Sequence, residues 1–393
     1  MNRNLWLLAI CQGLFLTNNV TFIAINGLVG LSLAPQGWMA TLPVMAYVVG
    51  GALSTSLVAQ TQRRLGRKAS FQLGLVVAMA SAALCAYAAI SQNFWLLCVA
   101  TLVAGYYNAN AGLYRFAAAE LSTSAWREKA VSIVMAGGLI GAIAGPNLAV
   151  WTRGLMRVPF TGAYLALAGV ALLSLILLSQ IQFPPVPAKT AAQGGRSLRV
   201  IMRQPVFAVA AFAGSLGYGV MNLLMAATPI AMQQCGLQFS DAALVLEWHV
   251  IGMFAPGFFT GHLIRRAGAL PVMGVGVALN ALCIVLALSG VSLHQFLGAL
   301  FLLGVGWNFL FTGSTTLSLQ TYTAEEKDRA QGALNFFIFA TVAATSLASG
   351  VLVTTQGWTM LNYASLLPVL FTGAALLWLA FNGKPGLIPR EKT

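Results

Sequence analysis

The chain has 393 residues, of which 59% are hydrophobic and only 7% are charged. A soluble domain carries about 25% charged residues because its surface must face water, so this composition excludes a soluble globular protein. The formal net charge of +13 comes from 21 Lys and Arg residues against 8 Asp and Glu residues. Because the basic residues gather in loops between apolar segments, this charge indicates membrane topology and not nucleic-acid binding.

Twelve apolar segments of about 20 residues follow one another, and each is long enough to cross about 30 Å of hydrocarbon as a helix. The first is too long for a signal-peptide core and no A-x-A cleavage site follows it, so we expect it to be retained. The sequence therefore predicts an all-α membrane protein with 12 transmembrane helices. The expected spans are 5–28, 39–59, 69–90, 94–120, 129–152, 160–182, 204–229, 240–264, 270–290, 295–320, 330–353 and 360–382.

The loops alternate sharply in charge. Eighteen of the 21 Lys and Arg residues lie at the amino terminus, in the loops after even-numbered spans, or in the tail. The other side has only Arg153 and Arg157, and Arg115 lies within a span. By the positive-inside rule, both termini and the long central loop are expected in the cytoplasm.

The chain repeats itself with a period near 200 residues. Residues 123–130 and 323–330 share a basic-acidic-basic triplet at the same offset, and Asn108 matches Asn308. The sequence therefore predicts two six-helix halves in parallel orientation, over 1–183 and 204–393. A cytoplasmic linker rich in proline and basic residues is expected to join them over 184–203.

The loop and repeat motifs resemble those of the major facilitator superfamily. Gly66-Arg67-Lys68 is similar to the end of its loop 2–3 signature, and Gly141-x-x-x-Gly145-Pro146 is similar to its helix 5 motif. The sequence departs from that signature at Arg63, where the family usually has Asp. The resemblance implies secondary transport by alternating access, with a substrate site near the midplane between the halves.

Two pairs of soft donors lie on consecutive predicted helices. Met221 and Met225 are spaced i,i+4, as are His249 and Met253, so each pair lies on one helical face. A methionine pair at this spacing is more often core packing, whereas a histidine inside the membrane is a functional candidate by default. Thioether and imidazole ligands favour Cu(I), which suggests a ladder for copper ions.

The order Met-x-x-x-Met then His-x-x-x-Met resembles the signature of the CcoA-type copper importers. This resemblance implies that the protein imports copper, as Cu(I), across the bacterial inner membrane. It also implies that Met221, Met225, His249 and Met253 handle the ion. Relatives in the same branch are thought to move riboflavin, so the substrate stays open. Thiol and thioether groups near the external end suggest a weak capture point at Met232 and Cys235.

Other polar residues inside the predicted spans have two interpretations. Glu247 is a candidate for proton coupling, or for a residue that reaches the external mouth or pairs with a neighbour. Arg115 and Glu120 are candidates for a gate or an ion pair. The remaining candidates either line the cavity or form hydrogen bonds between helices; they are Asn18, Asn19, Asn108, Asn110, Tyr218, Trp307 and Asn308.

Several alternatives remain beside copper import. One is import of riboflavin or a similar flat organic solute, with Tyr106, Tyr107, Tyr218 and Trp307 as stacking surfaces. Drug efflux is a third transport hypothesis. A membrane enzyme or a sensor is disfavoured, because the three His residues are dispersed and no loop is long enough for a soluble domain. We expect no cofactor, a monomer, and no partner beyond the transported solute and the lipid bilayer.

Overall fold

The computed structural model describes residues 3–123, 126–183, 195–323 and 325–382, and in these ranges the secondary structure is helical without any strand. The first half contains α1 (Arg3–Leu33), η1 (Gly37–Met39), α2 (Leu42–Ile90), α3 (Phe94–Ala111), α4 (Tyr114–Glu120), α5 (Arg127–Ala136), α6 (Gly138–Thr152) and α7 (Thr161–Ser179). The second half contains α8 (Leu198–Met202), α9 (Pro205–Gln234), α10 (Phe239–Phe254), α11 (Gly257–Ala267), α12 (Ala269–Leu288), α13 (Leu293–Ser318), η3 (Leu319–Thr321), α14 (Lys327–Thr355) and α15 (Gly357–Asn382).

The helices account for the twelve predicted spans. Within the described ranges, ten helical segments are long and apolar enough to cross a membrane. The pair α10 and α11, bent by 41° at its break, forms an eleventh span. The long helix α2 covers two predicted spans and breaks at Gly66, whose φ of 81° and ψ of 170° are not helical. The predicted all-α membrane architecture is therefore confirmed.

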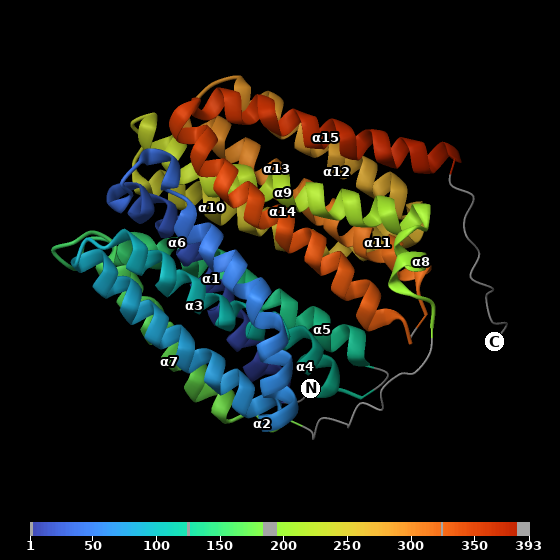
Figure 1. The fold of residues 1–393 in the computed structure, drawn as a ribbon, viewed down its shortest axis with the longest axis horizontal. Coiled ribbons are helices and arrows are strands. Elements are labelled where there is room, and N and C mark those ends of the chain that lie inside the picture. Colours follow the sequence, from blue (N-terminus) through green and yellow to red (C-terminus); the bar gives the residue numbers. More distant parts are fainter. Residues whose placement is uncertain (1–2, 124–125, 184–194, 324, 383–393) are drawn as a thin grey trace.

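The two halves form adjacent helix groups, drawn from blue to green and from yellow-green to red in Figure 1. The main contacts between the groups join α6 with α10, α2 and η1 with α14, and α1 with α9. One large hydrophobic cluster includes residues of both groups, from Val20 of α1 to Val369 of α15. The interface between the halves is thus part of the apolar core.

Glycines let two helix pairs approach until their backbones touch. A Cβ atom on Gly105 of α3 would lie 2.3 Å from the Gly50 carbonyl carbon of α2. A Cβ atom on Gly304 of α13 would lie 2.3 Å from the His249 carbonyl oxygen of α10. Small residues of this kind are typical of helix packing in lipid. The second contact fixes α10, which carries His249, tightly against α13.

Basic loops of both halves meet acidic or amide groups at one end of the molecule, which we call the basic end. Arg3, at the start of α1, donates to Gln180 just after α7 at 2.8 Å. Arg67, after the break in α2, forms an ion pair with Glu120 at the end of α4. We call the other end, where α1 connects to α2 and α10 begins, the opposite end.

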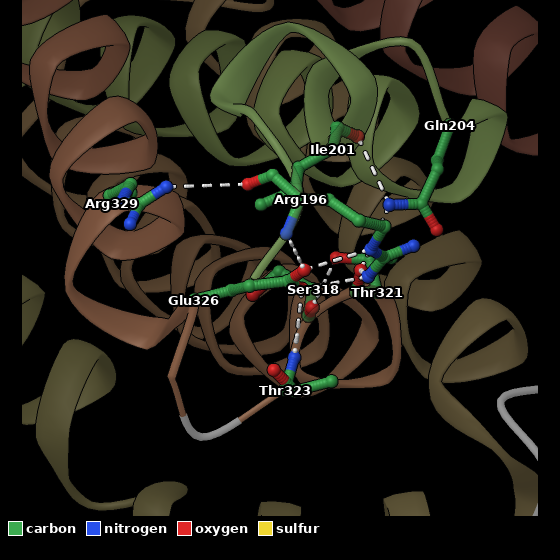
Figure 2. Close-up of polar contacts among 8 residues, drawn as sticks. All are labelled: Arg196, Ile201, Gln204, Ser318, Thr321, Thr323, Glu326 and Arg329. Atoms are coloured by element: carbon green, nitrogen blue, oxygen red, sulfur yellow. Dashed lines mark hydrogen bonds and ion pairs between the residues drawn. The ribbon is translucent and has the colours of Figure 1, made fainter. Parts of the chain in front are cut away.

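The segment that leads into the second half is anchored to that half by Arg196 and Glu326 (Figure 2). The Arg196 Nη2 atom lies 2.8 Å from Glu326 Oε2, and both its Nε and its backbone N–H donate to Glu326 Oε1. Arg196 also donates to the Thr321 carbonyl at 2.9 Å. The Glu326 side chain is only 2% exposed, so this carboxylate depends on its donors. The proposed domain boundary over 184–203 lies partly outside the described residues and stays a prediction.

We expect the Arg196–Glu326 pair to stabilise the fold equally from about pH 5 to 8 and to weaken only in acid. The Arg196 side chain, which donates to the carboxylate, lowers the pKa of Glu326 to about 2. Because this pKa is depressed, the stabilisation is complete above the ordinary glutamate pKa of about 4.3 and is lost as the pH falls toward 2. The difference in melting temperature between wild type and Glu326→Gln should stay constant above about pH 5 and shrink below about pH 4.5.

Glu325→Gln, at the neighbouring exposed carboxylate, serves as the control. If the difference in melting temperature between wild type and Glu326→Gln changed between about pH 6 and 8, the depressed pKa of Glu326 would not be its cause.

Candidate functional site

The four predicted soft donors are all buried. Met221 and Met225 of α9 are 3% and 5% exposed, and His249 and Met253 of α10 are 0% and 7% exposed. The three methionines belong to the large cluster that spans both halves, and His249 lies on the same helix as Met253. The structure therefore turns them into the protein core and not toward lipid, while their role in binding copper stays a prediction.

His249 has one satisfied and one free ring nitrogen. Its Nδ1 atom lies 2.7 Å from the Leu300 carbonyl oxygen of α13. Because a carbonyl can only accept a hydrogen bond, Nδ1 carries the proton and Nε2 keeps a lone pair. The Nε2 atom is buried without a hydrogen-bond partner among the described residues. A proton on Nε2 as well would leave a charged ring with a buried donor that has no acceptor, so the site suits the neutral imidazole, in which Nε2 is a free acceptor.

The predicted capture point is divided between the interior and the surface. Met232 is completely buried, whereas Cys235, directly after α9, is exposed. Partial burial raises the pKa of the Cys235 thiol above its usual range, which disfavours the thiolate that binds metals. In the described part of the chain, no group of three or more His, Cys, Asp or Glu side chains is placed to hold a metal. Any copper path would thus depend on thioethers and a single imidazole.

Aromatic side chains of three second-half helices form a cluster. Trp307 and Phe311, one turn apart on α13, stack at 5.0 Å with an angle of 10° between their planes. Tyr218 of α9 meets both rings edge-on, at 5.3 Å from Trp307 and 5.7 Å from Phe311. Phe254, at the end of α10, lies 6.3 Å from Trp307. We call these four residues the aromatic ledge.

The aromatic ledge lies at the interface with the first half. Phe254 packs both against the large shared cluster and against a first-half cluster that contains Tyr107 and Tyr114. Tyr47 of α2 and Arg115 of α4 both lie close enough to Tyr218 for electrostatic interaction. Rings of one half therefore face polar groups of the other.

The predicted stacking tyrosines do not all gather at this place. Tyr218 and Trp307 belong to the aromatic ledge, as described above. Tyr106, in contrast, contacts the Thr61 hydroxyl at 3.1 Å, and Tyr107 packs edge-on against Phe15 at 5.5 Å. These two tyrosines pack within the first half. A stacking surface would thus be built from the second half alone.

Asn308 holds the bend between α10 and α11. Its Nδ2 atom donates to the Met253 carbonyl at 2.7 Å, and its Oδ1 atom accepts from Thr260 at 2.6 Å. Pro256 lies at the break and has no N–H group to continue the helix, so nearby carbonyls need other donors. Both ends of the Asn308 amide are therefore used within the protein, as the hydrogen-bonding interpretation expects.

The other predicted asparagines lie in the first half. Asn18 of α1 donates to the Leu167 carbonyl of α7 at 3.4 Å, and Asn19 donates to the Tyr47 hydroxyl at 3.0 Å. Asn110 accepts from Ser70 at 3.1 Å. Asn108 is half-buried, and its Nδ2 atom lies 3.2 Å from the position of a Cβ atom on Gly51. Asn18 and Asn110 thus join helices within this half, and Asn19 fixes a tyrosine that faces the aromatic ledge.

Glu247 forms a hydrogen bond between the halves. The Asn147 Nδ2 atom of α6 donates to Glu247 Oε2 of α10 at 2.8 Å. Further contacts close the opposite end, where Thr41 donates to the Ser346 carbonyl at 2.6 Å. Phe160 also packs edge-on against Phe239 at 5.0 Å. The two halves are therefore closed against each other at this end.

A cavity of about 530 Å³ lies at the opposite end, bounded by residues of both halves. Arg153 lies over the rings of Phe160 and Phe239, at 5.3 and 5.4 Å from their centroids, and all three line this cavity. None of the predicted site residues is among those that line it. The cavity is thus distinct from the soft donors and from the aromatic ledge.

Arg115 and Glu120 are not paired with each other. Glu120 accepts from Arg67 Nε at 2.9 Å, and the two residues form an ion pair within the first half. The Nε atom of Arg115 is buried without a hydrogen-bond partner among the described residues. Among the side chains that the structure describes, the ring beneath its guanidinium is that of its neighbour Phe116, at 4.9 Å.

Sequence reasoning missed three residues of this region: Asn147, Phe254 and Phe311. Phe311 was detectable, because it follows Trp307 at i,i+4 spacing and so lies on the same face. Asn147, directly after the Gly-Pro motif, was detectable only as a polar residue within an apolar span. Phe254 carried no signal, since it joins the ledge through the bend at Pro256.

Comparison with known proteins identifies the fold and the family. The family model described as Major Facilitator Superfamily matches residues 5–255 and 210–392. Among solved structures, a bacterial homologue of the human lysosomal transporter Spinster aligns with a TM-score of 0.73 and 12% identity, covering 96% of each chain. An auto-inhibited peptide transporter of the POT family aligns with a TM-score of 0.70 and 11% identity, covering 100% of this chain and 99% of that one.

Two relatives match along most of their length. The riboflavin transporter RfnT of Brucella anthropi is 38% identical over 364 residues, which cover 92% of each chain. The uncharacterized transporter YddS of Bacillus subtilis is 27% identical over 91% of this chain and 86% of its own. The chain therefore belongs to the major facilitator superfamily and is a secondary transporter.

Proposed function

We propose that this transporter imports riboflavin or a similar flat organic solute across the bacterial inner membrane, with the basic end in the cytoplasm. The observation that carries the proposal is the aromatic ledge, in which the Trp307 and Phe311 rings are parallel and Phe254 packs against a first-half cluster. Stacking of a flat heteroaromatic ring on an aromatic side chain contributes about 1–3 kcal/mol. The similarity to the riboflavin transporter RfnT supports the same solute.

The position of the aromatic ledge suits alternating access. Rings at the interface of the two halves become accessible from either side when the halves rock against each other. The contacts at the opposite end, such as the hydrogen bond from Asn147 to Glu247, close one side of this interface. A solute on the aromatic ledge would thus be separated from the external medium in the conformation described here.

Uptake by purified protein in proteoliposomes tests the proposal. Radiolabelled riboflavin should enter in a saturable manner, and excess unlabelled riboflavin should compete with it. The measurement is made with and without a proton gradient, and Cu(I) is offered to parallel vesicles. Riboflavin uptake no greater than that of protein-free liposomes would reject the proposed substrate.

Copper is a second candidate because of one observation, the free Nε2 lone pair of His249. A metal-binding histidine commonly donates its other ring N–H to a carbonyl, as His249 does to Leu300. Under this hypothesis, His249→Ala or Met221→Ala should abolish accumulation of radioactive copper while the protein still inserts in the membrane. Unchanged accumulation in both variants would exclude copper as the solute.

A further inference from the structure

Arg115 is a half-buried cation without a matching anion in the described part of the protein. Its Nε atom has no hydrogen-bond partner, and Glu120, one turn later on the same helix, is already paired with Arg67. The other ion pair of the described residues, Arg196 with Glu326, lies in the second half. A charged group inside a membrane protein is costly to keep unpaired, which makes it a candidate for binding a ligand.

The position of Arg115 relates it to the aromatic ledge. Its guanidinium lies close enough to the Tyr218 hydroxyl for electrostatic interaction across the interface. Tyr114, the preceding residue, belongs to the first-half cluster against which Phe254 of the aromatic ledge packs. A planar donor group of the first half and a stacking surface of the second half therefore approach the same part of the interface.

An arginine guanidinium is suited to one particular arrangement of acceptors. Its parallel N–H groups can donate to two neighbouring acceptors in one plane, as when arginine binds N7 and O6 of guanine. The isoalloxazine ring of riboflavin carries such pairs twice, as N5 beside the C4 carbonyl and as N1 beside the C2 carbonyl. Lysine lacks this fork and acts as a point charge.

We propose that Arg115 binds the edge of the stacked solute by donating two hydrogen bonds to an adjacent ring nitrogen and carbonyl oxygen. The substrate class is therefore a fused heteroaromatic ring with a neighbouring pair of acceptors, and this inference rests on the proposed function. If the pair is N5 with the C4 carbonyl, the site rejects reduced flavin, in which N5 carries a proton and donates.

Competition with isosteric analogues tests this contact. In 5-deazariboflavin and 1-deazariboflavin, a C–H group replaces one ring nitrogen while the shape is preserved. Each analogue competes with radiolabelled riboflavin for uptake by wild type, Arg115→Gln and Arg115→Lys in proteoliposomes. Arg64→Gln, at an exposed arginine of the same half, removes the same charge away from the interface and is the matched control.

We expect one of the two analogues to bind at least about tenfold more weakly than riboflavin to wild type, since a lost hydrogen bond to a charged donor has an effect of this size. In Arg115→Gln and Arg115→Lys, riboflavin itself should bind more weakly. Riboflavin and the weaker-binding analogue should then have the same affinity. The Arg64→Gln variant should behave as wild type.

Two results would overturn the inference. Equal competition by riboflavin and both deaza analogues in wild type would show that no ring nitrogen is bound, even if the Arg115 variants failed to fold. If riboflavin and the deaza analogue still differed in affinity for Arg115→Gln, another donor would make the contact. Both outcomes leave riboflavin transport itself intact, whereas absence of riboflavin uptake by wild type would reject the proposed function and this contact together.

Discussion

Trp307→Ala should reduce the apparent affinity for riboflavin uptake at least about tenfold, since stacking on one aromatic ring contributes about 1–3 kcal/mol. Trp307 stacks in parallel with Phe311 and also contacts Tyr218, so its removal disrupts the whole aromatic ledge. Trp307→Phe retains a ring and should keep most of the affinity. The measurement is saturable uptake of radiolabelled riboflavin in proteoliposomes, normalised to correctly inserted protein.

A matched control separates stacking from general damage. Trp378→Ala removes the same side chain from α15, where Trp378 is 50% exposed and outside the aromatic ledge. Both variants are checked for a monodisperse profile in detergent, because loss of the nearly buried Trp307 also removes packing. His249→Ala should have a mild effect on riboflavin. If Trp307→Ala and Trp378→Ala gave the same kinetics, the aromatic ledge would not be the binding surface.

Breaking the hydrogen bond between Asn147 and Glu247 should open the end that they close. A hydrogen bond to a charged group contributes about 1.5–3 kcal/mol, which corresponds to a shift of about tenfold or more between closed and open populations. We therefore expect Glu247→Leu and Asn147→Leu to populate the open form at this end. Spin labels at Gln36 and Gln356, exposed residues on either side of the contact between Gly37 and Thr354, report the change as a longer distance.

Glu247→Gln separates the effect of the hydrogen bond to Asn147 from the effect of the negative charge on Glu247. The glutamine carbonyl still accepts from Asn147, so the distance between the labels should match that of wild type. If Glu247 also couples transport to protons, Glu247→Gln should retain exchange of riboflavin across the membrane but lose accumulation driven by a proton gradient. Label distances that remained unchanged in both leucine variants would contradict a closing role for this pair.

The sequence predicts the helices well because the bilayer imposes strong physical limits on them. A span must be about 20 apolar residues long, so composition alone locates the spans and the basic loops. The break at Gly66 falls between two predicted spans, where a positive φ favours glycine. The ion pair between Arg196 and Glu326 could not be predicted, because it joins segments 130 residues apart through a folded loop.

The site was harder to predict, because buried helices in a membrane are apolar on every face. Hydrophobic periodicity then does not show which neighbour a side chain meets. The spacing of His249 and Met253 placed both on one face, but the contact of His249 with Leu300 depends on the close approach allowed by Gly304. Asn308, expected in the cavity or between helices, holds a bend between α10 and α11 that no periodic pattern describes.

The anchoring of Arg196 to Glu326 determines where the polypeptide can be divided without separating these partners. If the chain is expressed as two fragments split ahead of Gly195, the guanidinium and the carboxylate remain on one fragment. A split after Arg203 places them on different fragments, and their association becomes an intermolecular event that depends on concentration. The segment 195–204 is therefore held to the second half, although it precedes α9, the first membrane-spanning helix of that half.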